Sequence, residues 1–406
     1  MKKTTQRKTI VIAFSGGLDT SFCVPHLIQT EGARIVTVTV DTGGFTSNEL
    51  KSIKARALRL GASRHVCIDA RKRVWDGFLS TIIQGNCLRG GVYPLSVSAE
   101  RTAQAMAVVE LARQEKAYAV AHGSTGAGND QVRFDLAFRT LEPSLKIITP
   151  IRDLGLSREQ ERVFLEKQGV KIPAKTTRYS INAGLCGVTI GGGETHDPWL
   201  SISEEAFTTT KNPEKASVKG EMVLLSFRNG LPVTLNGRPM DGVNLITRLA
   251  EIGGRHGVGR GIHLGDTILG IKGRIAFEAP GPLIAIQAHR ELEKLVLTAS
   301  QQQWKAQVSE SYAQMLHAGL YFDPVVRDLE SLIQSSQHRV TGDVRILLRR
   351  GRILVEGVRS PYSLMARKVA TYGEENILWT ARDAAGFCKI YGLQGSLASK
   401  VGRAGR

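Results

Sequence analysis

The chain has 406 residues, of which 42% are hydrophobic and 22% are charged, a composition typical of a soluble globular protein with room for two domains. No apolar stretch approaches membrane-spanning length, and residues 1–8 lead into a β-rich run and not into a signal peptide. The net charge of +17 is diffuse, so we attribute it to anionic substrates and solubility and expect neither a membrane nor a nucleic acid as partner.

The first predicted unit is a strand, a glycine turn and a helix. Residues 9–14 form an apolar, β-branched run typical of a buried parallel strand, residues 15–17 turn the chain, and 18–29 are predicted to be helical. The unpaired N–H groups of the helix N-terminus, with the hydroxyls of Thr20 and Ser21, predict a phosphate site. The Walker A lysine is absent, and the Ser-Gly-Gly-x-Asp-[Ser/Thr] pattern resembles the pyrophosphate loop (PP-loop) of N-type ATP pyrophosphatases.

Short β-rich runs alternate with helical patterns to about residue 170, which predicts an α/β fold with a doubly wound parallel sheet. The next predicted strands are 34–40, 65–69, 118–121 and 146–148, and the helices are 46–60, 97–114 and one that follows Ser157. Ligands bind beyond the carboxyl ends of such strands, so the loops at Ser15, Asp41 and His122 are expected to converge on one nucleotide.

The composition changes near Pro173, which predicts a nucleotide-binding domain over 1–170, an α+β domain over 171–360 and a tail over 361–406. The glycine-rich, polar residues 174–195 are predicted to form a functional loop. Further strands are expected at 222–227, 232–235, 267–271 and 283–286, a hairpin at 344–356, and helices at 243–252 and 287–316.

Four longer motifs narrow the family. They are Ala121-His122-Gly123-Ser124-Thr125-Gly126-Ala127-Gly128-Asn129-Asp130-Gln131-Val132-Arg133-Phe134, Tyr93-Pro94-Leu95 with Ser98 and Arg101, residues 252–260, and Ser360-Pro361-Tyr362-Ser363-Leu364. Together they resemble the argininosuccinate synthase family over nearly the whole chain, from about residue 9 to 393. The resemblance implies condensation of citrulline with aspartate for arginine biosynthesis, with ATP and Mg²⁺, in a homotetramer joined by the C-terminal segment.

The resemblance also implies the site residues. The ATP-binding positions are Ala13, Phe14, Ser15, Gly16, Gly17, Leu18, Asp19, Thr20, Ser21, Val40 and Gly123. The aspartate-binding positions are Thr125, Asn129 and Asp130, and the citrulline-binding positions are Tyr93, Ser98, Asn129, Arg133, Ser180, Thr189 and Phe277. Asp19, Ser21 and Arg133 are the expected catalytic residues; Asp19 is the candidate Mg²⁺ contact, and the planar fork of Arg133 suits a substrate carboxylate.

Taken singly, several of these residues have plainer interpretations. Asn129 and Asp130 could cap the following helix, and Tyr93 could belong to the core. His122 is expected to be structural. No residue stands out as a general base, so catalysis is expected to rest on positioning and charge stabilisation.

Three departures from the family pattern concern the substrates. Ala127 replaces the lysine of Gly-Lys-Gly-Asn-Asp, Gly265-Asp266-Thr267 stands where the family has Glu-Asn-Arg, and Phe277 replaces a tyrosine. The missing glutamate and tyrosine help to bind citrulline in the family. Either Asp266 or Glu278 therefore pairs with the citrulline ammonium, or the substrate is an Nα-acylated citrulline.

Two functions of other classes compete with this interpretation. A tRNA-modifying PP-loop enzyme would need a CxxC or a catalytic cysteine pair, whereas the five cysteines lie far apart and indicate reduced thiols in the cytoplasm. A non-catalytic nucleotide or amino-acid sensor would suit the departures at Ala127, Gly265 and Phe277, but the intact loop from Ser15 to Ser21 favours catalysis.

Overall fold

The computed structural model describes residues 7–170, 178–365, 371–373 and 376–404. The chain divides after Pro361 into a large unit and a small C-terminal one. Within the described residues, no helix combines the length and the apolar character needed to cross a membrane.

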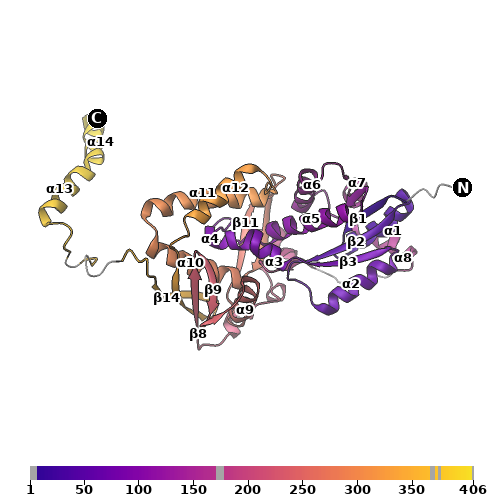
Figure 1. The fold of residues 1–406 in the computed structure, drawn as a ribbon, viewed down its shortest axis with the longest axis horizontal. Coiled ribbons are helices and arrows are strands. Elements are labelled where there is room, and N and C mark those ends of the chain that lie inside the picture. Colours follow the sequence, from indigo (N-terminus) through magenta and orange to yellow (C-terminus); the bar gives the residue numbers. More distant parts are fainter. Residues whose placement is uncertain (1–6, 171–177, 366–370, 374–375, 405–406) are drawn as a thin grey trace. The chain divides into compact units, whose positions relative to one another are not determined.

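The N-terminal part of the large unit is built on a five-stranded parallel sheet, which confirms the predicted α/β class (Figure 1). Its strands are β1 (Thr9–Ala13), β2 (Arg34–Asp41), β3 (Arg64–Asp69), β4 (Ala119–Ala121) and β5 (Lys146–Ile148), in the order β3-β2-β1-β4-β5. The helices between them are α1 (Leu18–Glu31), α2 (Ser47–Arg59), α5 (Ser96–Gln114), α6 (Asn129–Leu141), α7 (Pro150–Leu154) and α8 (Arg158–Lys167).

Both faces of this sheet are buried, as its continuous apolar strands require. Ile10 and Ile12 of β1 lie in a core with α1, α2 and α8, whereas Val11 lies in a core with α5 and α6. Capping boxes at Thr46 and Ser157 begin α2 and α8, as the sequence predicts.

The rest of the large unit contains two antiparallel sheets. One has the order β11-β12-β7-β6, with β6 (Tyr179–Gly184), β7 (Gly187–Gly192), β11 (Arg260–Asp266) and β12 (Lys272–Glu278). The other has the order β10-β9-β8-β13-β14, with β8 (Glu221–Arg228), β9 (Leu231–Leu235), β10 (Arg238–Pro239), β13 (Gly342–Arg349) and β14 (Arg352–Arg359). Four helices accompany these sheets: α9 (Gly242–Arg255), α10 (Pro280–Val296), α11 (Ala299–Ala318) and α12 (Pro324–Ser335).

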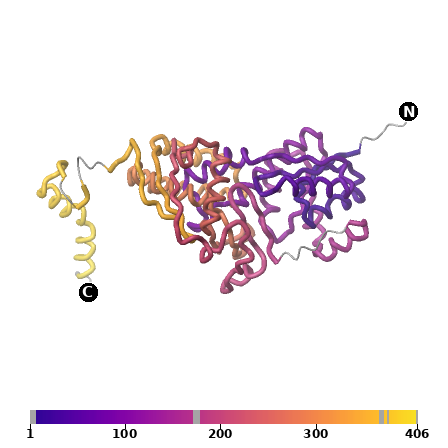
Figure 2. The backbone as a smooth tube through the Cα atoms, turned by 90° about the horizontal axis from the view of Figure 1, so that it is seen from below, coloured from indigo at the N-terminus to yellow at the C-terminus, as the bar shows by residue number. Residues whose placement is uncertain are grey.

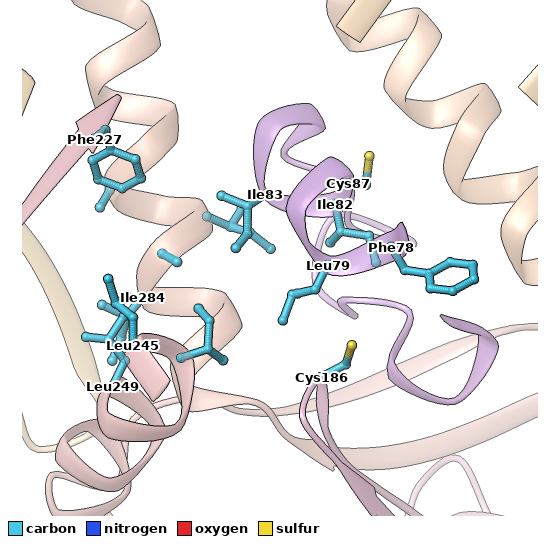
Figure 3. Close-up of a cluster of buried hydrophobic side chains, with 14 of the residues drawn as sticks. Phe78, Leu79, Ile82, Ile83, Cys87, Cys186, Phe227, Leu245, Leu249 and Ile284 are labelled. Carbon is cyan, nitrogen blue, oxygen red and sulfur yellow. The ribbon is translucent and has the colours of Figure 1, made fainter. Parts of the chain in front are cut away.

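The largest core joins segments that lie far apart in the sequence. The segment between β3 and α5 forms α3 (Arg71–Val74), the π-helical turn η1 (Trp75–Leu79) and α4 (Ser80–Gly85). Its apolar side chains Phe78, Leu79, Ile82 and Ile83 pack in one cluster with residues of α9, α10 and β8 (Figure 3). In Figure 2 the same purple segment runs among the magenta and orange elements. The chain therefore leaves the parallel sheet after β3 and returns to it through α5.

The structure corrects three predictions. Of the predicted loop 174–195, residues 174–177 lie outside the described residues, and 179–192 form the β6–β7 hairpin instead of a loop. The hairpin glycines permit close packing, since a Cβ on Gly184 would lie 2.2 Å from the carboxylate of Glu100. Residues 267–271 are the turn between β11 and β12. Residues 283–286 belong to α10, which begins at Pro280 and ends before Thr298, where a capping box starts α11 and divides the predicted helix 287–316.

The small C-terminal unit contains α13 (Ala381–Tyr391) and α14 (Leu393–Ala404). Both helices leave large apolar side chains uncovered within this unit, among them Phe387, Ile390, Leu397 and Val401.

Candidate functional site

The loop after β1 has the geometry of a phosphate site. Gly16 has a φ of +76°, which favours glycine, and Gly17 is the N-cap of α1. The Ser15 hydroxyl accepts a hydrogen bond from Gly17 N at 3.3 Å and lies 3.2 Å from the Thr20 hydroxyl. Ser15 and Gly17 are exposed. The loop therefore presents hydroxyls and backbone N–H groups at a helix N-terminus, a combination that binds phosphate.

Asp19 and Ser21 follow the loop in the first turn of α1. Ser21 is fully buried, and within the described residues its hydroxyl has no hydrogen-bond partner. Asp19 and Leu18 are half-buried, and Asp19 lies beside Glu161 of α8. Burial, the charge of Asp19 and a hydrogen bond with it raise the pKa of Glu161 to about 8. The raised pKa favours the protonated form of Glu161, which limits the negative charge close to the loop.

The loop after β4 touches the N-terminus of α1. A Cβ added to Gly123 would lie 3.1 Å from both Asp19 C and Thr20 N, so the two chains meet there at backbone distance. His122 is held by Asp135, 2.9 Å from its Nε2, and its Nδ1 accepts from Ser124 N at 3.2 Å. Both imidazole nitrogens have protein partners, which fits a structural histidine.

The predicted adenosine contacts lie at the ends of β1 and β2. Phe14 N donates to Val38 O at 2.8 Å, and the Thr39 hydroxyl donates to Phe14 O at 2.6 Å. Phe14 and Val40 are buried and Ala13 is half-buried. The strand ends are thus fixed rigidly beside the phosphate loop.

A charged network connects the predicted aspartate and citrulline residues. Asp130 accepts from Arg101 Nε at 2.8 Å and from Arg133 Nη1 at 3.0 Å. Burial raises the pKa of Asp130, but the two arginines outweigh it and hold that pKa below its ordinary value. Arg133 also donates to the His317 carbonyl from Nε at 3.2 Å and from Nη2 at 3.1 Å. The fork of Arg133, predicted to clamp a substrate, is thus occupied by protein groups in this structure.

Two contacts link this network to the antiparallel sheet. Arg101 donates to the side chain of Asn182 on β6. Asn129 Oδ1 accepts from Ile268 N at 2.9 Å and so holds the turn between β11 and β12. Thr125 and Ala127, in the loop before α6, are exposed. Asn129 and Asp130 lie in the first turn of α6, but their side chains bond to partners outside that turn and do not cap it.

Three predicted citrulline residues come together above one face of the β11-β12-β7-β6 sheet. Thr189 is paired with Phe277 in register, and opposite residues of an antiparallel pair share a face. The Tyr93 and Thr189 hydroxyls share a hydrogen bond of 2.8 Å, and the Tyr93 and Phe277 rings are 5.4 Å apart. The register places Ser180 on this face too, at an exposed position. Ser98, in the first turn of α5, is buried, and its hydroxyl has no partner within the described residues.

The two carboxylates expected to pair with a citrulline ammonium lie on the side of the sheet away from Phe277. The carboxylate of Asp266 pairs with Lys272 at 2.7 Å, and Asp266 lies on the opposite face of β11 from the Phe277 side. Glu278 is fully buried and accepts from Thr208 N, Thr209 N, Thr210 N and the Thr210 hydroxyl at 2.6–3.0 Å. Glu278 is thus fully engaged by protein groups, Asp266 is held by an exposed ion pair, and the pairing of either with a citrulline ammonium stays a prediction.

Arg89 and His263 belong to the same face, although no sequence motif points to them. The His263 ring stacks on Tyr93 at 5.9 Å, and Arg89 donates to the carbonyl of Asp266. The alternation of β11 could have revealed His263, but the strand was not predicted.

Glu100 anchors the β6–β7 hairpin to α5 and gives the protein a pH-dependent stability. Cys186 N donates to Glu100 Oε1 at 3.1 Å, and burial raises the pKa of Glu100 from its ordinary value of 4.5 to about 8. The folded state therefore keeps a proton that the unfolded state loses above about pH 4.5, so this contribution declines as the pH rises toward 8.

A Glu100→Gln variant retains the acceptor for Cys186 but cannot ionise. Relative to the unmodified protein, its free energy of unfolding is expected to rise by about 2–4 kcal/mol between pH 5 and pH 9 in urea titrations. Glu110→Gln, an exposed change on the same helix, should show no such pH-dependent gain. Parallel pH profiles for Glu100→Gln and the unmodified protein would contradict the assignment.

Comparison with known proteins agrees with this arrangement. Residues 9–171 match the model described as arginosuccinate synthase N-terminal HUP domain, and residues 179–398 match the arginosuccinate synthase C-terminal domain. The chain is 42% identical to an argininosuccinate synthase of Thermosynechococcus vestitus, over 95% of this chain and 96% of the relative. It is 40% identical to one of Methanocaldococcus jannaschii, over 95% and 97%, and 39% identical to one of Xanthomonas axonopodis pv. citri, over 98% and 97%. The phosphate loop, the Asp130 network and these matches over nearly the whole length lead to one conclusion: the chain belongs to the argininosuccinate synthase family.

Proposed function

We infer that the chain is an ATP-dependent ligase that condenses citrulline with aspartate to give argininosuccinate, AMP and pyrophosphate in arginine biosynthesis. The observation that carries this inference is the open PP-loop at the N-terminus of α1, in a chain that matches both domains of the family. The loop would bind ATP, whose α-phosphorus is the electrophile. The Asp130 network and the sheet face with Tyr93 and Thr189 would position the two amino acids.

The first step makes a leaving group of the citrulline ureido oxygen. That oxygen attacks the α-phosphorus of ATP, forms a citrullyl-AMP intermediate and releases pyrophosphate. We assign the pyrophosphate to Ser15, Gly17 and Thr20, whose hydroxyl and N–H groups lie at the positive end of α1. We assign Ser21 to the same phosphate site, because its buried hydroxyl has no partner within the described residues, and Gly123 allows the β4 loop to approach the nucleotide.

In the second step the aspartate amine attacks the activated ureido carbon and AMP leaves. We assign Thr125, Asn129 and Asp130 to aspartate, and Tyr93, Ser98, Arg133, Ser180, Thr189 and Phe277 to citrulline. Arg101 and Arg133 both form ion pairs with Asp130. Their positive charges would offset the negative charge of the substrate carboxylates and phosphates bound nearby.

We propose that Mg²⁺ enters with ATP. Within the described residues, no group of three histidine, cysteine or acidic side chains could hold a metal by itself. Mg²⁺ commonly binds through one or two carboxylates plus substrate phosphates, and Asp19 is the acidic residue in the first turn of α1, directly after the phosphate loop. When bound, the ion would neutralise phosphate charge beside Asp19.

The test is pyrophosphate release from Mg·ATP in the presence of citrulline and aspartate. Turnover that needs both amino acids is expected. Because the ureido oxygen must first be adenylated, ¹⁸O in the citrulline ureido group should appear in AMP. Absence of turnover with an intact fold would leave the sensor, and activity on tRNA without citrulline would identify a modifying enzyme.

We propose a cytoplasmic homotetramer joined by the C-terminal unit. The exposed apolar side chains of α13 and α14, including Phe387, Ile390 and Val401, are the supporting observation, since a solvated helix pair seldom carries so many. Light scattering on the full chain tests the mass, and a monomer at micromolar concentration would contradict the proposal.

A further inference from the structure

We call the side of the β11-β12-β7-β6 sheet that faces Tyr93 the substrate face. On this face the edge strand β11 carries no acidic side chain. Opposite pairing of Gly261 with Phe277 and of His263 with Ile275 places these side chains on the side that faces Tyr93. Gly265 follows on the same side, opposite Gly273. On this side of β11 the His263 imidazole is therefore flanked by two glycines, Gly261 and Gly265.

The surroundings of His263 are shaped to hold its ring. A Cβ on Gly90 would lie 2.9 Å from His263 Cε1, and a Cβ on Gly265 would lie 2.7 Å from its Nε2. The Nε2 atom is buried and has no hydrogen-bond partner within the described residues. His122 and His289, by contrast, use both ring nitrogens in protein hydrogen bonds. A buried nitrogen without a partner costs free energy, so His263 Nε2 is suited to a ligand.

Arg89 adds a positive charge at the same place. Its Nη2 lies 3.7 Å from the position of a Cβ on Gly265 and donates to the Asp266 carbonyl. Burial lowers the pKa of Arg89, and the nearby charge of Arg133 lowers it further. Burial and Arg89 likewise lower the pKa of His263. An ammonium group brought to this place would meet the guanidinium of Arg89, a like charge, which is unfavourable.

We propose that Arg89 and His263 Nε2–H bind the carboxylate of the ureido substrate, and that the enzyme does not need the α-ammonium group of that substrate. The substrate class is thus ureido carboxylic acids of citrulline length, with or without an α-amino group. This inference rests on the proposed function. The two groups fit a carboxylate because the Arg89 guanidinium and the unpartnered ring nitrogen Nε2 of His263, which can donate when it carries the ring proton, both lie on one side of Gly265.

The first test compares citrulline with 5-ureidopentanoate, which has the same carboxylate and ureido group but no amine. With Mg·ATP and aspartate, kcat/KM of pyrophosphate release for 5-ureidopentanoate is expected to lie within about threefold of that for citrulline. A loss of about a hundredfold or more would overturn the inference while leaving the proposed function intact. Absence of turnover with citrulline itself would instead refute the proposed function.

Two variants identify the carboxylate partners. Arg89→Gln and His263→Leu are each expected to raise KM by about tenfold or more for both ureido substrates, with little change in KM for ATP. Arg89→Lys should recover part of the Arg89→Gln loss because it restores the charge. The matched control is Lys272→Gln, which removes an exposed cation from the opposite face of the sheet and should leave both KM values unchanged.

The pattern across substrates separates binding from a folding defect. A misfolded variant would lose its thermal transition and raise KM for ATP as well. If Arg89→Gln and His263→Leu fold normally and bind both ureido substrates as the unmodified enzyme does, Arg89 and His263 do not form the carboxylate site.

Discussion

A Gly123→Val variant is expected to lose at least about a hundredfold in kcat/KM for pyrophosphate release while it remains folded. The β4 loop meets the first turn of α1 at Gly123, where even a Cβ would lie 3.1 Å from Asp19 C and Thr20 N. These neighbours are backbone atoms and cannot rotate away. The valine would push the β4 loop off the phosphate loop by a fraction of an ångström to an ångström, at the point where ATP must be held in line for attack.

Gly126→Ala provides the control in the same loop. A Cβ there would meet only the flexible Arg152 side chain at 3.6 Å, an ordinary contact, so near-normal activity is expected. Gly123→Ala should fall between these two variants. Equal activity of Gly123→Val and the unmodified enzyme would show that the β4 loop has no part in holding ATP.

The parallel sheet could be predicted because its signals are local. The apolar run of β1 is continuous, and Thr46 and Ser157 begin their helices with capping boxes that need only four residues. Once the alternation of strands and helices was established, the convergence of loops at one sheet edge followed from topology alone.

The predictions for the antiparallel sheets and their helices were wrong where tertiary packing overrides the local sequence pattern. The glycines of 184–192 predict a loop from the sequence alone. The structure shows a packing reason for one of them, because Glu100 lies against Gly184 and leaves no room for a side chain. Residues 283–286 are an apolar run of ambiguous period, and Pro280 at the start of α10 was the available signal for a helix.

Motif matching identified the substrate residues but not their partners. Arg133 was expected to bind a substrate carboxylate, yet in this structure Asp130 and the His317 carbonyl occupy its donors. The His317 contact lies 184 residues away in sequence, beyond the reach of any local pattern. Arg89 and His263 match no motif. The β11 register brings His263 to the substrate face, and the bridge to Tyr93 and the bond to the Asp266 carbonyl bring Arg89 there.

An Asp130→Ala variant is expected to lower kcat/KM by about a hundredfold or more and the free energy of unfolding by about 2–4 kcal/mol. Asp130 is the carboxylate between Arg101 and Arg133, whose side chains are 15% and 4% exposed. Its removal leaves two largely buried guanidinium groups facing each other. The side chain of Asp130 is itself 30% exposed, so water moderates the penalty, which places the estimate below that of a fully buried pair.

Asp130→Asn separates charge from shape in that network. The amide keeps an oxygen that can accept from Arg101 or Arg133 but removes the negative charge, so the free energy of unfolding should fall less than with alanine. The change in KM for aspartate then distinguishes direct binding of aspartate from positioning of Arg133. If Asp130 binds the aspartate ammonium directly, KM for aspartate rises in both variants. If it only positions Arg133, kcat falls and KM for citrulline rises instead. Glu142→Gln, which breaks the ion pair with Arg113 just beyond the other end of α6, should change none of these quantities. Full activity and normal stability of Asp130→Ala would mean that the two arginines are held by other contacts, and the network would then have no part in binding either amino acid.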